Sequence, residues 1–326
     1  MRLSLLPVSL LLLLLCLMGR AGAQCCAPGN PVGGNINPGA NPSGQTLLWL
    51  GHRYGYAGRY FDGAQPIAPT FVRAGDYQHL TLSATHGLSE HLTAQAELGY
   101  VLYKRQWYVP GVRPTQLSGR GFTDLTLLVR VNVLRDEVRG WELTLGLGPK
   151  LPLGSYQQTQ GGIRLPQDLQ PSTGAVELVQ TIFLQKTLLP RKLRFFALSH
   201  FELKGQNPEG YRFGPLLAVA AFGSYAPMPR WTFLSQLRYE WRGRDTRPLT
   251  GQGFALDNGR EQVPPTGSQR LWLGPQVAFQ PNPDWQISLL AEWPLFQRYH
   301  AQQLGSSFSA MVSVARWLRA GGTSGK

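Results

Sequence analysis

The sequence predicts an all-β protein: a transmembrane antiparallel up-and-down β-barrel of about 12 strands with both termini in the periplasm. Three observations predict this fold. They are an N-terminal export signal, segments that alternate apolar and polar residues with a period of two, and connections that alternate between short and long. A period of two gives a strand two chemically different faces. In a membrane barrel the apolar face meets lipid and the polar face lines the lumen.

The alternation is clearest in five segments, 92–103, 124–133, 141–151, 231–242 and 285–296. Every second residue from positions 92, 125, 141, 231 and 285 onward gives one set of 29 positions, of which none is charged and only Ser235 is polar. The other set holds 28 positions and includes nine charged residues that we expect to face the lumen: Glu97, Asp124, Arg130, Glu142, Lys150, Arg238, Glu240, Arg242 and Glu292. Two further polar residues, His200 and Glu202, share one face of their segment and could pair in the lumen. These side chains either lock the barrel wall through salt bridges or screen a passing solute.

We expect twelve strands of a length suited to crossing a membrane at a tilt. They are 46–54, 77–87, 92–103, 122–134, 141–151, 174–186, 193–204, 212–225, 231–242, 269–279, 285–296 and 306–317. The short connections are 88–91, 135–140, 187–192, 226–230 and 280–284, and the longer ones are 55–76, 104–121, 152–173, 205–211, 243–268 and 297–305. Short turns belong to the periplasmic end of such barrels and longer loops to the outside. Trp141, Trp231 and Trp285 follow short turns, as expected for an aromatic belt at a membrane interface.

The first 23 residues have the pattern of a secretion signal. Arg2 gives a basic start, residues 5–18 are nearly all apolar, and small residues lead to a predicted cleavage after Ala23. The predicted organisation is a signal peptide at 1–23, a Gly/Pro/Asn-rich segment at 24–44, an outer-membrane barrel at 45–317 and a short tail at 318–326. No mature stretch reaches about 18 consecutive apolar residues, so we expect no transmembrane helix.

The segment 24–44 leaves two questions open. It is too poor in apolar residues to pack alone, so it is either a periplasmic tail or a plug that enters the lumen. Cys25 and Cys26 could form a strained vicinal disulfide or an inter-chain disulfide, with metal binding or lipidation as further alternatives. Gln24 is too large for the position before a lipidated cysteine.

The charge is strongly positive, with a formal value of +13 in which arginine supplies 25 of 31 basic residues. Removal of Arg2 and Arg20 with the signal leaves 13 − 2 = +11. Arginine binds phosphate in a bidentate fashion, so the excess indicates contact with lipopolysaccharide and outer-membrane lipid, or else only a GC-rich genome. The other expected partners are a small-molecule solute and the barrel-assembly machinery. Nucleic acid is not expected, because the basic residues form no single stripe.

Several short blocks carry a family resemblance. Gly121-Phe122-Thr123-Asp124-Leu125, residues 148–154, residues 169–174 and Ala291-Glu292-Trp293-Pro294-Leu295 resemble blocks of the outer-membrane transporters labelled as the MetA pathway of phenol degradation. The resemblance covers roughly residues 75–317. Ser172 departs from it where glycine is expected, and Phe122-Thr123 replaces a smaller pair. It implies a barrel that passes hydrophobic or aromatic compounds across the outer membrane, and it implies no catalytic residue.

The sequence contains no recognisable catalytic or cofactor motif. It has no Ser/His cluster of known type, no Asp-Asp pair, no glycine-rich phosphate loop and no metal-ligand spacing, so we expect neither an enzyme nor a cofactor. The predicted function is an outer-membrane channel or transporter for passive passage of small hydrophobic or aromatic molecules. The alternatives are a structural or adhesive barrel that acts through its extracellular loops and, with less support, an outer-membrane lipid-modifying enzyme.

Overall fold

The computed structural model describes residues 39–69, 72–111, 114–190, 192–249, 254–256, 259–263 and 265–319. The predicted signal peptide, Cys25 and Cys26, the rest of the segment up to residue 38 and the end of the chain from residue 320 lie outside the described residues. Among the described residues, no helix is both long enough and apolar enough to span a membrane.

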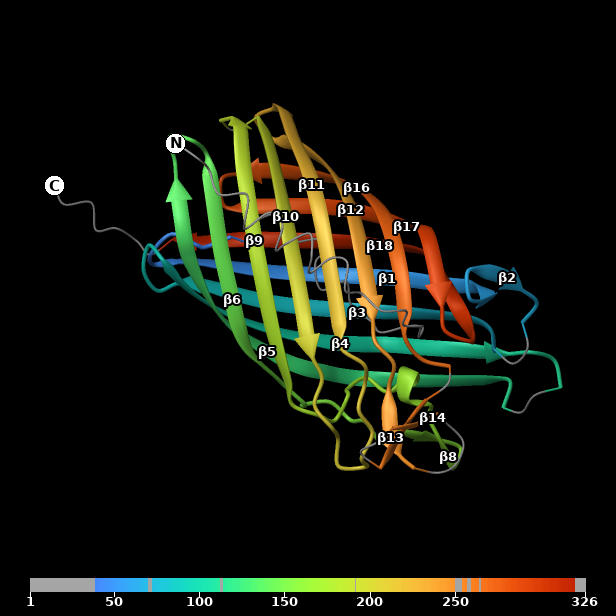
Figure 1. Cartoon of the computed structure of the whole chain (residues 1–326). Helices are drawn as coiled ribbons and strands as arrows, with labels where there is room; N and C mark the ends of the chain where they lie inside the picture. The colour runs from blue at the N-terminus through green and yellow to red at the C-terminus, as the bar shows by residue number, and fades with distance from the viewer. Residues whose placement is uncertain are drawn as a thin grey trace, which may run out of the picture.

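The chain forms a closed antiparallel β-barrel (Figure 1). Thirteen strands share the main sheet, and β2 (Gln65–Ile67) pairs only with β1, which leaves twelve strands in the ring. The ring closes because the last strand pairs with the first along nearly its whole length, from Gln45 opposite Arg319 to Asp62 opposite Gln302. In order, the ring strands are β1 (Gln45–Asp62), β3 (Val72–Gly87), β4 (Leu92–Tyr108), β5 (Gln116–Asp136), β6 (Trp141–Leu151), β9 (Glu177–Leu189), β10 (Leu193–Leu203), β11 (Leu216–Met228), β12 (Trp231–Arg242), β16 (Ser268–Asn282), β17 (Trp285–Tyr299) and β18 (Gln302–Arg319).

Five short connections lie at one end of the barrel, here named the turn end, and the other connections lie at the opposite loop end. The turns at 88–91, 137–140, 190–192, 229–230 and 283–284 are short, as the sequence predicts. Two connections at the loop end carry small elements of their own. These are β7 (Thr159–Gln160), β8 (Ile163–Arg164) and the 3-10 helix η1 (Gln167–Leu169) in one, and β13 (Thr246–Pro248), β14 (Phe254–Leu256) and β15 (Arg260–Gln262) in the other.

Three predicted loops at this end are wrong in length because the strands continue past the expected limits. Strands β1 and β3 extend into the predicted connection 55–76, and strands β4 and β5 extend into 104–121. Figure 1 shows these extended strands at the side of the barrel where β2 lies. The connection predicted at 297–305 is only two residues, His300 and Ala301, and Ala301 has a φ of 58°. Here the end of β17 pairs with β16 and the start of β18 pairs with β1, so each strand is held by its other neighbour.

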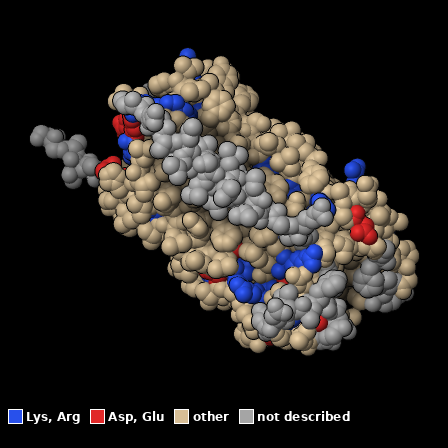
Figure 2. Space-filling view, viewed as in Figure 1, with Lys and Arg blue, Asp and Glu red and all other residues tan. Residues whose placement is uncertain are grey.

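The two faces of the strands differ as the alternation predicts. Large apolar side chains point outward, for example Leu82, Val129, Leu147 and Leu289, each more than half exposed. Polar and charged side chains of the other parity are buried inside the ring, including Gln236, Arg238 and Glu292. On the face shown in Figure 2, uncharged residues cover most of the surface and Lys and Arg gather in a few places. The barrel therefore presents an apolar belt outside and ionic groups inside.

The chain just before β1 lies inside the turn end of the barrel. Asn41 is buried, its backbone N–H donates to Thr93 Oγ1 at 3.0 Å, and its side-chain amide donates to the Thr85 carbonyl at 2.9 Å. Arg130 Nη1 donates to the Gly39 carbonyl at 3.4 Å. Gly87 permits this approach, because a Cβ there would lie 2.1 Å from the Pro42 carbonyl oxygen. Gly39 to Pro42 thus lie against the barrel wall from within.

Candidate functional site: the lumen

The lumen wall has two apolar patches toward the turn end. On β9–β12 the inward residues Phe183, Phe196, Phe222 and Leu234 form one patch, in which the Phe196 and Phe222 rings stack with centroids 4.4 Å apart. On β1, β17 and β18, a second patch contains Leu47, Trp49, Leu290 and Met311. The lumen wall is therefore not only polar, because two groups of apolar side chains also face the lumen.

Nearer the loop end, a cluster of five charged residues lines the wall formed by β1, β12, β16 and β17. We name it the Glu292 network; its members are Arg53, Arg238, Glu240, Arg270 and Glu292. Glu292 has no exposed surface; it accepts hydrogen bonds from Gln236 Nε2 at 2.7 Å, Arg238 Nη2 at 3.1 Å and Ser309 Oγ at 2.9 Å, and it pairs with Arg53. Glu240 bridges Arg238 and Arg270. Three guanidinium groups thus meet two carboxylates.

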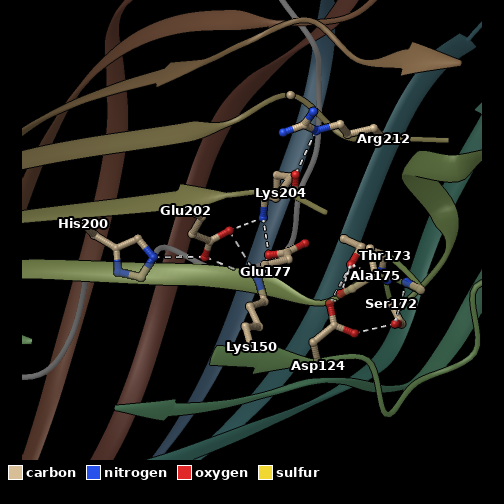
Figure 3. Close-up of polar contacts among 12 residues, drawn as sticks. Asp124, Lys150, Ser172, Thr173, Ala175, Glu177, His200, Glu202, Lys204 and Arg212 are labelled. Atoms are coloured by element: carbon tan, nitrogen blue, oxygen red, sulfur yellow. Dashed lines mark hydrogen bonds and ion pairs between the residues drawn. The ribbon is translucent and has the colours of Figure 1, made fainter. Parts of the chain in front are cut away.

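The other side of the ring carries a second cluster, on β6, β9 and the end of β10; β11 separates these strands from β12, and β3, β4 and β5 separate them from β1. We name it the Glu202 network; its members are Lys150, Glu177, His200, Glu202 and Lys204 (Figure 3). Both lysines contact both glutamates, with Lys204 Nζ 2.7 Å and Lys150 Nζ 3.2 Å from Glu177 Oε2. The predicted partners His200 and Glu202 are in contact, at 3.0 Å. Two ammonium groups balance two carboxylates, so these four side chains together carry no net charge.

Asp124 and Glu142, two more of the predicted lumen residues, bond to residues of a connection and of the chain before β1. Asp124 accepts hydrogen bonds from Ser172 Oγ and, at 3.0 Å, from Thr173 Oγ1. Glu142 accepts from the Ala40 backbone N–H at 3.2 Å and from Asn132 Nδ2 at 3.3 Å. Ser172, Thr173 and Ala40 lie outside the ring strands, so a connection and the chain before β1 help to hold these two carboxylates.

Glu97 and Arg242 complete the predicted set. Glu97 is half-buried and has one long contact, from Gln95 Nε2 at 3.5 Å. Arg242 is buried at the loop end of β12 beside Ser268 of β16, close enough to Asp245 to influence its ionisation.

Connections fold over the mouth at the loop end. Leu169 of η1 is buried, and its carbonyl oxygen would lie 2.1 Å from a Cβ at position 119, so Gly119 of β5 lets η1 approach the wall. Asp245 accepts hydrogen bonds from the Tyr211 hydroxyl and from the Gly214 N–H at 2.8 Å, which ties two connections together. Burial raises the pKa of Asp245 to about 6.

Between the Glu292 network and this cover lies a cavity of about 650 Å³. Its charged lining is Arg53, Arg238, Glu240 and Arg270 on one side, with Asp76, Lys104 and Arg105 on the other. Its apolar and aromatic lining includes Tyr77, Leu169, Trp272 and Phe308. Among the residues that the structure describes, no group of three or more His, Cys, Asp or Glu could hold a metal ion.

Solved structures with this architecture are outer-membrane proteins. An outer membrane channel from Pseudomonas putida aligns with a TM-score of 0.65 at 14% identity, covering 87% of this chain and all of that chain. The chain has that channel's fold. The NanC porin (TM-score 0.45, 11% identity, 83% and 98% covered) and a Pseudomonas aeruginosa FadL homologue (TM-score 0.41, 10% identity, 83% and 90% covered) are more distant.

The comparisons of sequence found no match, whereas the comparison of structures did. No protein-family model matches the chain, and no curated protein matches it. The resemblance to the MetA-pathway transporters is therefore supported only at the level of an outer-membrane channel fold.

Sequence reasoning missed several partners in the two networks: Arg53, Glu177, Lys204 and Arg270. Arg53 and Arg270 lie on the lumen parity of β1 and β16, so a parity assignment for those strands would have found them. Lys204 continues the parity of His200 and Glu202, so the face assigned to those residues would have found it, whereas Glu177 lies among residues that are apolar on both parities and give no face assignment.

Proposed function

We propose that this protein is an outer-membrane channel for the passive passage of small hydrophobic or aromatic molecules. The observation that carries the proposal is the apolar lining inside a closed barrel. Phe183, Phe196 and Phe222 face the lumen on consecutive strands, where a water-filled pore would have polar residues. Burying apolar surface of a solute against them gains roughly 25 cal/mol per Å².

The barrel geometry supports the same proposal. Twelve strands enclose more than the side-chain-filled interior of about 8 strands and less than the open channel of about 16. The apolar belt suits a bilayer, and the short turns suit the periplasmic side with both termini there. The two networks then act as locks that stiffen the wall on opposite sides of the passage.

Two observations weaken the alternatives. An adhesive barrel acts through extended outer loops, but much of the predicted loop length is strand, and η1 and residues near Asp245 fold inward. A lipid hydrolase of serine type needs a histidine bonded to a serine. Among the described histidines, the His200 ring contacts Glu202 and the His86 ring contacts Thr46, and no imidazole ring shows a hydrogen bond to a serine hydroxyl.

Single-channel recording of the purified protein in planar bilayers, together with swelling of liposomes in solutions of small solutes, tests the proposal. We expect stable conductance steps and solute entry. A folded, inserted barrel that gives neither would reject the channel and favour the adhesive alternative. Hydrolysis of phospholipid or lipopolysaccharide by the same preparation would instead establish the enzyme.

A further inference from the structure

Among the residues that the structure describes, the Glu292 network holds one more positive charge than negative charge. Arg53, Arg238 and Arg270 face Glu240 and Glu292, three cations against two anions. The other charges that line the cavity are compensated locally. Arg105 forms a bidentate pair with Asp76, at 2.9 and 2.7 Å, and Lys104 lies near Asp168. The excess of one charge thus remains at the Arg238 side of the cavity.

Two adjacent residues on this side each have a buried donor that finds no acceptor in the described part of the chain. Arg238 Nε and Trp272 Nε1 make no hydrogen bond, although both side chains are more than nine-tenths buried. The two residues are cross-strand partners on β12 and β16, and the Arg238 guanidinium carbon lies 5.0 Å from the centre of the Trp272 ring. A buried donor without an acceptor is costly, so adjacent donors beside an excess positive charge suit an anion with two oxygens.

The rest of the cavity is suited to an apolar group. Leu169 and Leu304, both buried, line it together with the Trp272 ring. A purely polar anion such as phosphate would leave this wall uncovered.

We propose that this cavity binds one amphipathic monocarboxylate, an aromatic or alkyl acid, with its carboxylate at Arg238 Nε and Trp272 Nε1. The proposal rests on the channel function and refines it: the carboxylate would be held at the Glu292 network before the apolar part meets the lumen patches near the turn end. The balanced Glu202 network, with two lysines and two glutamates, offers no equivalent excess.

The test is calorimetric titration of the purified, folded barrel with benzoate, benzyl alcohol and inorganic phosphate. Benzoate should bind at least tenfold more tightly than benzyl alcohol, which has a similar size but no charge. It should also bind at least tenfold more tightly than phosphate, which has no apolar part. Trp272→Phe keeps the ring and removes the N–H, and should weaken benzoate binding roughly five- to tenfold. Trp293→Phe, at an outward residue that is 46% exposed, is the matched control and should change nothing.

Equal affinities for benzoate and benzyl alcohol would overturn the anion site, and equal affinities for benzoate and phosphate would overturn the apolar wall. Unchanged benzoate binding in Trp272→Phe would also overturn the proposed carboxylate site. Conductance without benzoate binding would reject the site and leave the channel, whereas benzoate binding without conductance would support the site and reject the channel.

Discussion

Arg53 and Glu292 form an ion pair between residues 239 positions apart in the sequence. Arg53 lies on β1 and Glu292 on β17, so the pair spans the intervening strand β18, where the ring closes. Ser309 of β18 donates to the same carboxylate at 2.9 Å. One buried side chain thus joins three strands across the seam of the barrel.

Replacing Glu292 with glutamine should destabilise the barrel strongly. The change leaves the buried Arg53 and Arg238 without their shared carboxylate, a loss of about 3–5 kcal/mol in the free energy of unfolding. Urea unfolding in detergent, followed by heat-modifiable gel migration, measures it. Glu97→Gln is the control, because Glu97 is half-buried and makes one long contact. Similar losses in both variants would contradict the assigned importance of the network.

The outward and inward faces of β5 predict opposite responses to arginine. Leu127→Arg places an unpaired charge in lipid, which costs about 2–4 kcal/mol at the bilayer midplane, and should reduce assembly into the membrane. Thr126→Arg points the same side chain into the lumen and should assemble better. The amount of heat-modifiable barrel in membranes is the measurement. Equal loss in the two variants would mean that the faces of β5 are reversed.

Orientation in the membrane follows from the two kinds of connection. An epitope inserted at Gly259, in an exposed turn of the loop end, should bind antibody on intact cells. The same epitope at Val138, which is 99% exposed in a turn of the opposite end, should bind only after permeabilisation. The reverse pattern would place the termini outside the cell.

The contact between Tyr211 and Asp245 should depend on pH. Because burial raises the pKa of Asp245 to about 6, the folded connection favours the protonated acid. The resulting stabilisation is complete below the ordinary carboxyl pKa near 4 and is lost as the pH rises through about 6.

Hydrogen exchange of residues 211–214, corrected for intrinsic rates, should therefore show easier opening at pH 7.5 than at pH 5. Asp245→Asn, which stays neutral, should remove the difference between the two pH values. A pH dependence that persists in Asp245→Asn would assign the effect to another group.

The position of Gly39 to Asn41 supports a plug over a periplasmic tail for the N-terminal segment. These residues lie inside the turn end, and residues 24–38, to which the predicted plug belongs, lie outside the described residues. Deleting residues 26–40 behind the same signal should raise single-channel conductance without reducing the amount of folded barrel. Unchanged conductance in the folded deletion variant would leave the segment as a tail.

The alternation of residues was enough to predict the ring, since each strand needs only its own two faces. It failed where both parities are apolar: Ile182, Phe183 and Leu184 give no indication of which side chain enters the lumen. Only the neighbours Phe196 and Phe222 settle the matter, since Phe183 packs with them inside the ring.

Most charged residues of the candidate site were found for the same reason, but their partners were not. Which lumen residues meet depends on the stagger between strands and on how the ring closes. The pairing of Lys150 with Glu177 and Glu202, two strands beyond its own at the farthest, is a property of that closed geometry. Periodicity within one strand contains no information about it.

The seam between β1 and β18 also sets an order of events. Hairpins such as β3–β4 join neighbours in the chain and can pair as soon as both strands exist. The first strand, however, must wait for the last, and contacts between such distant residues form slowly. Arg53 therefore has no carboxylate from β17 until nearly all the chain has been inserted. Variants of Arg53 or Glu292 should leave early hairpins intact and delay the final step of assembly, in which β18 pairs with β1 and the open sheet becomes a closed barrel.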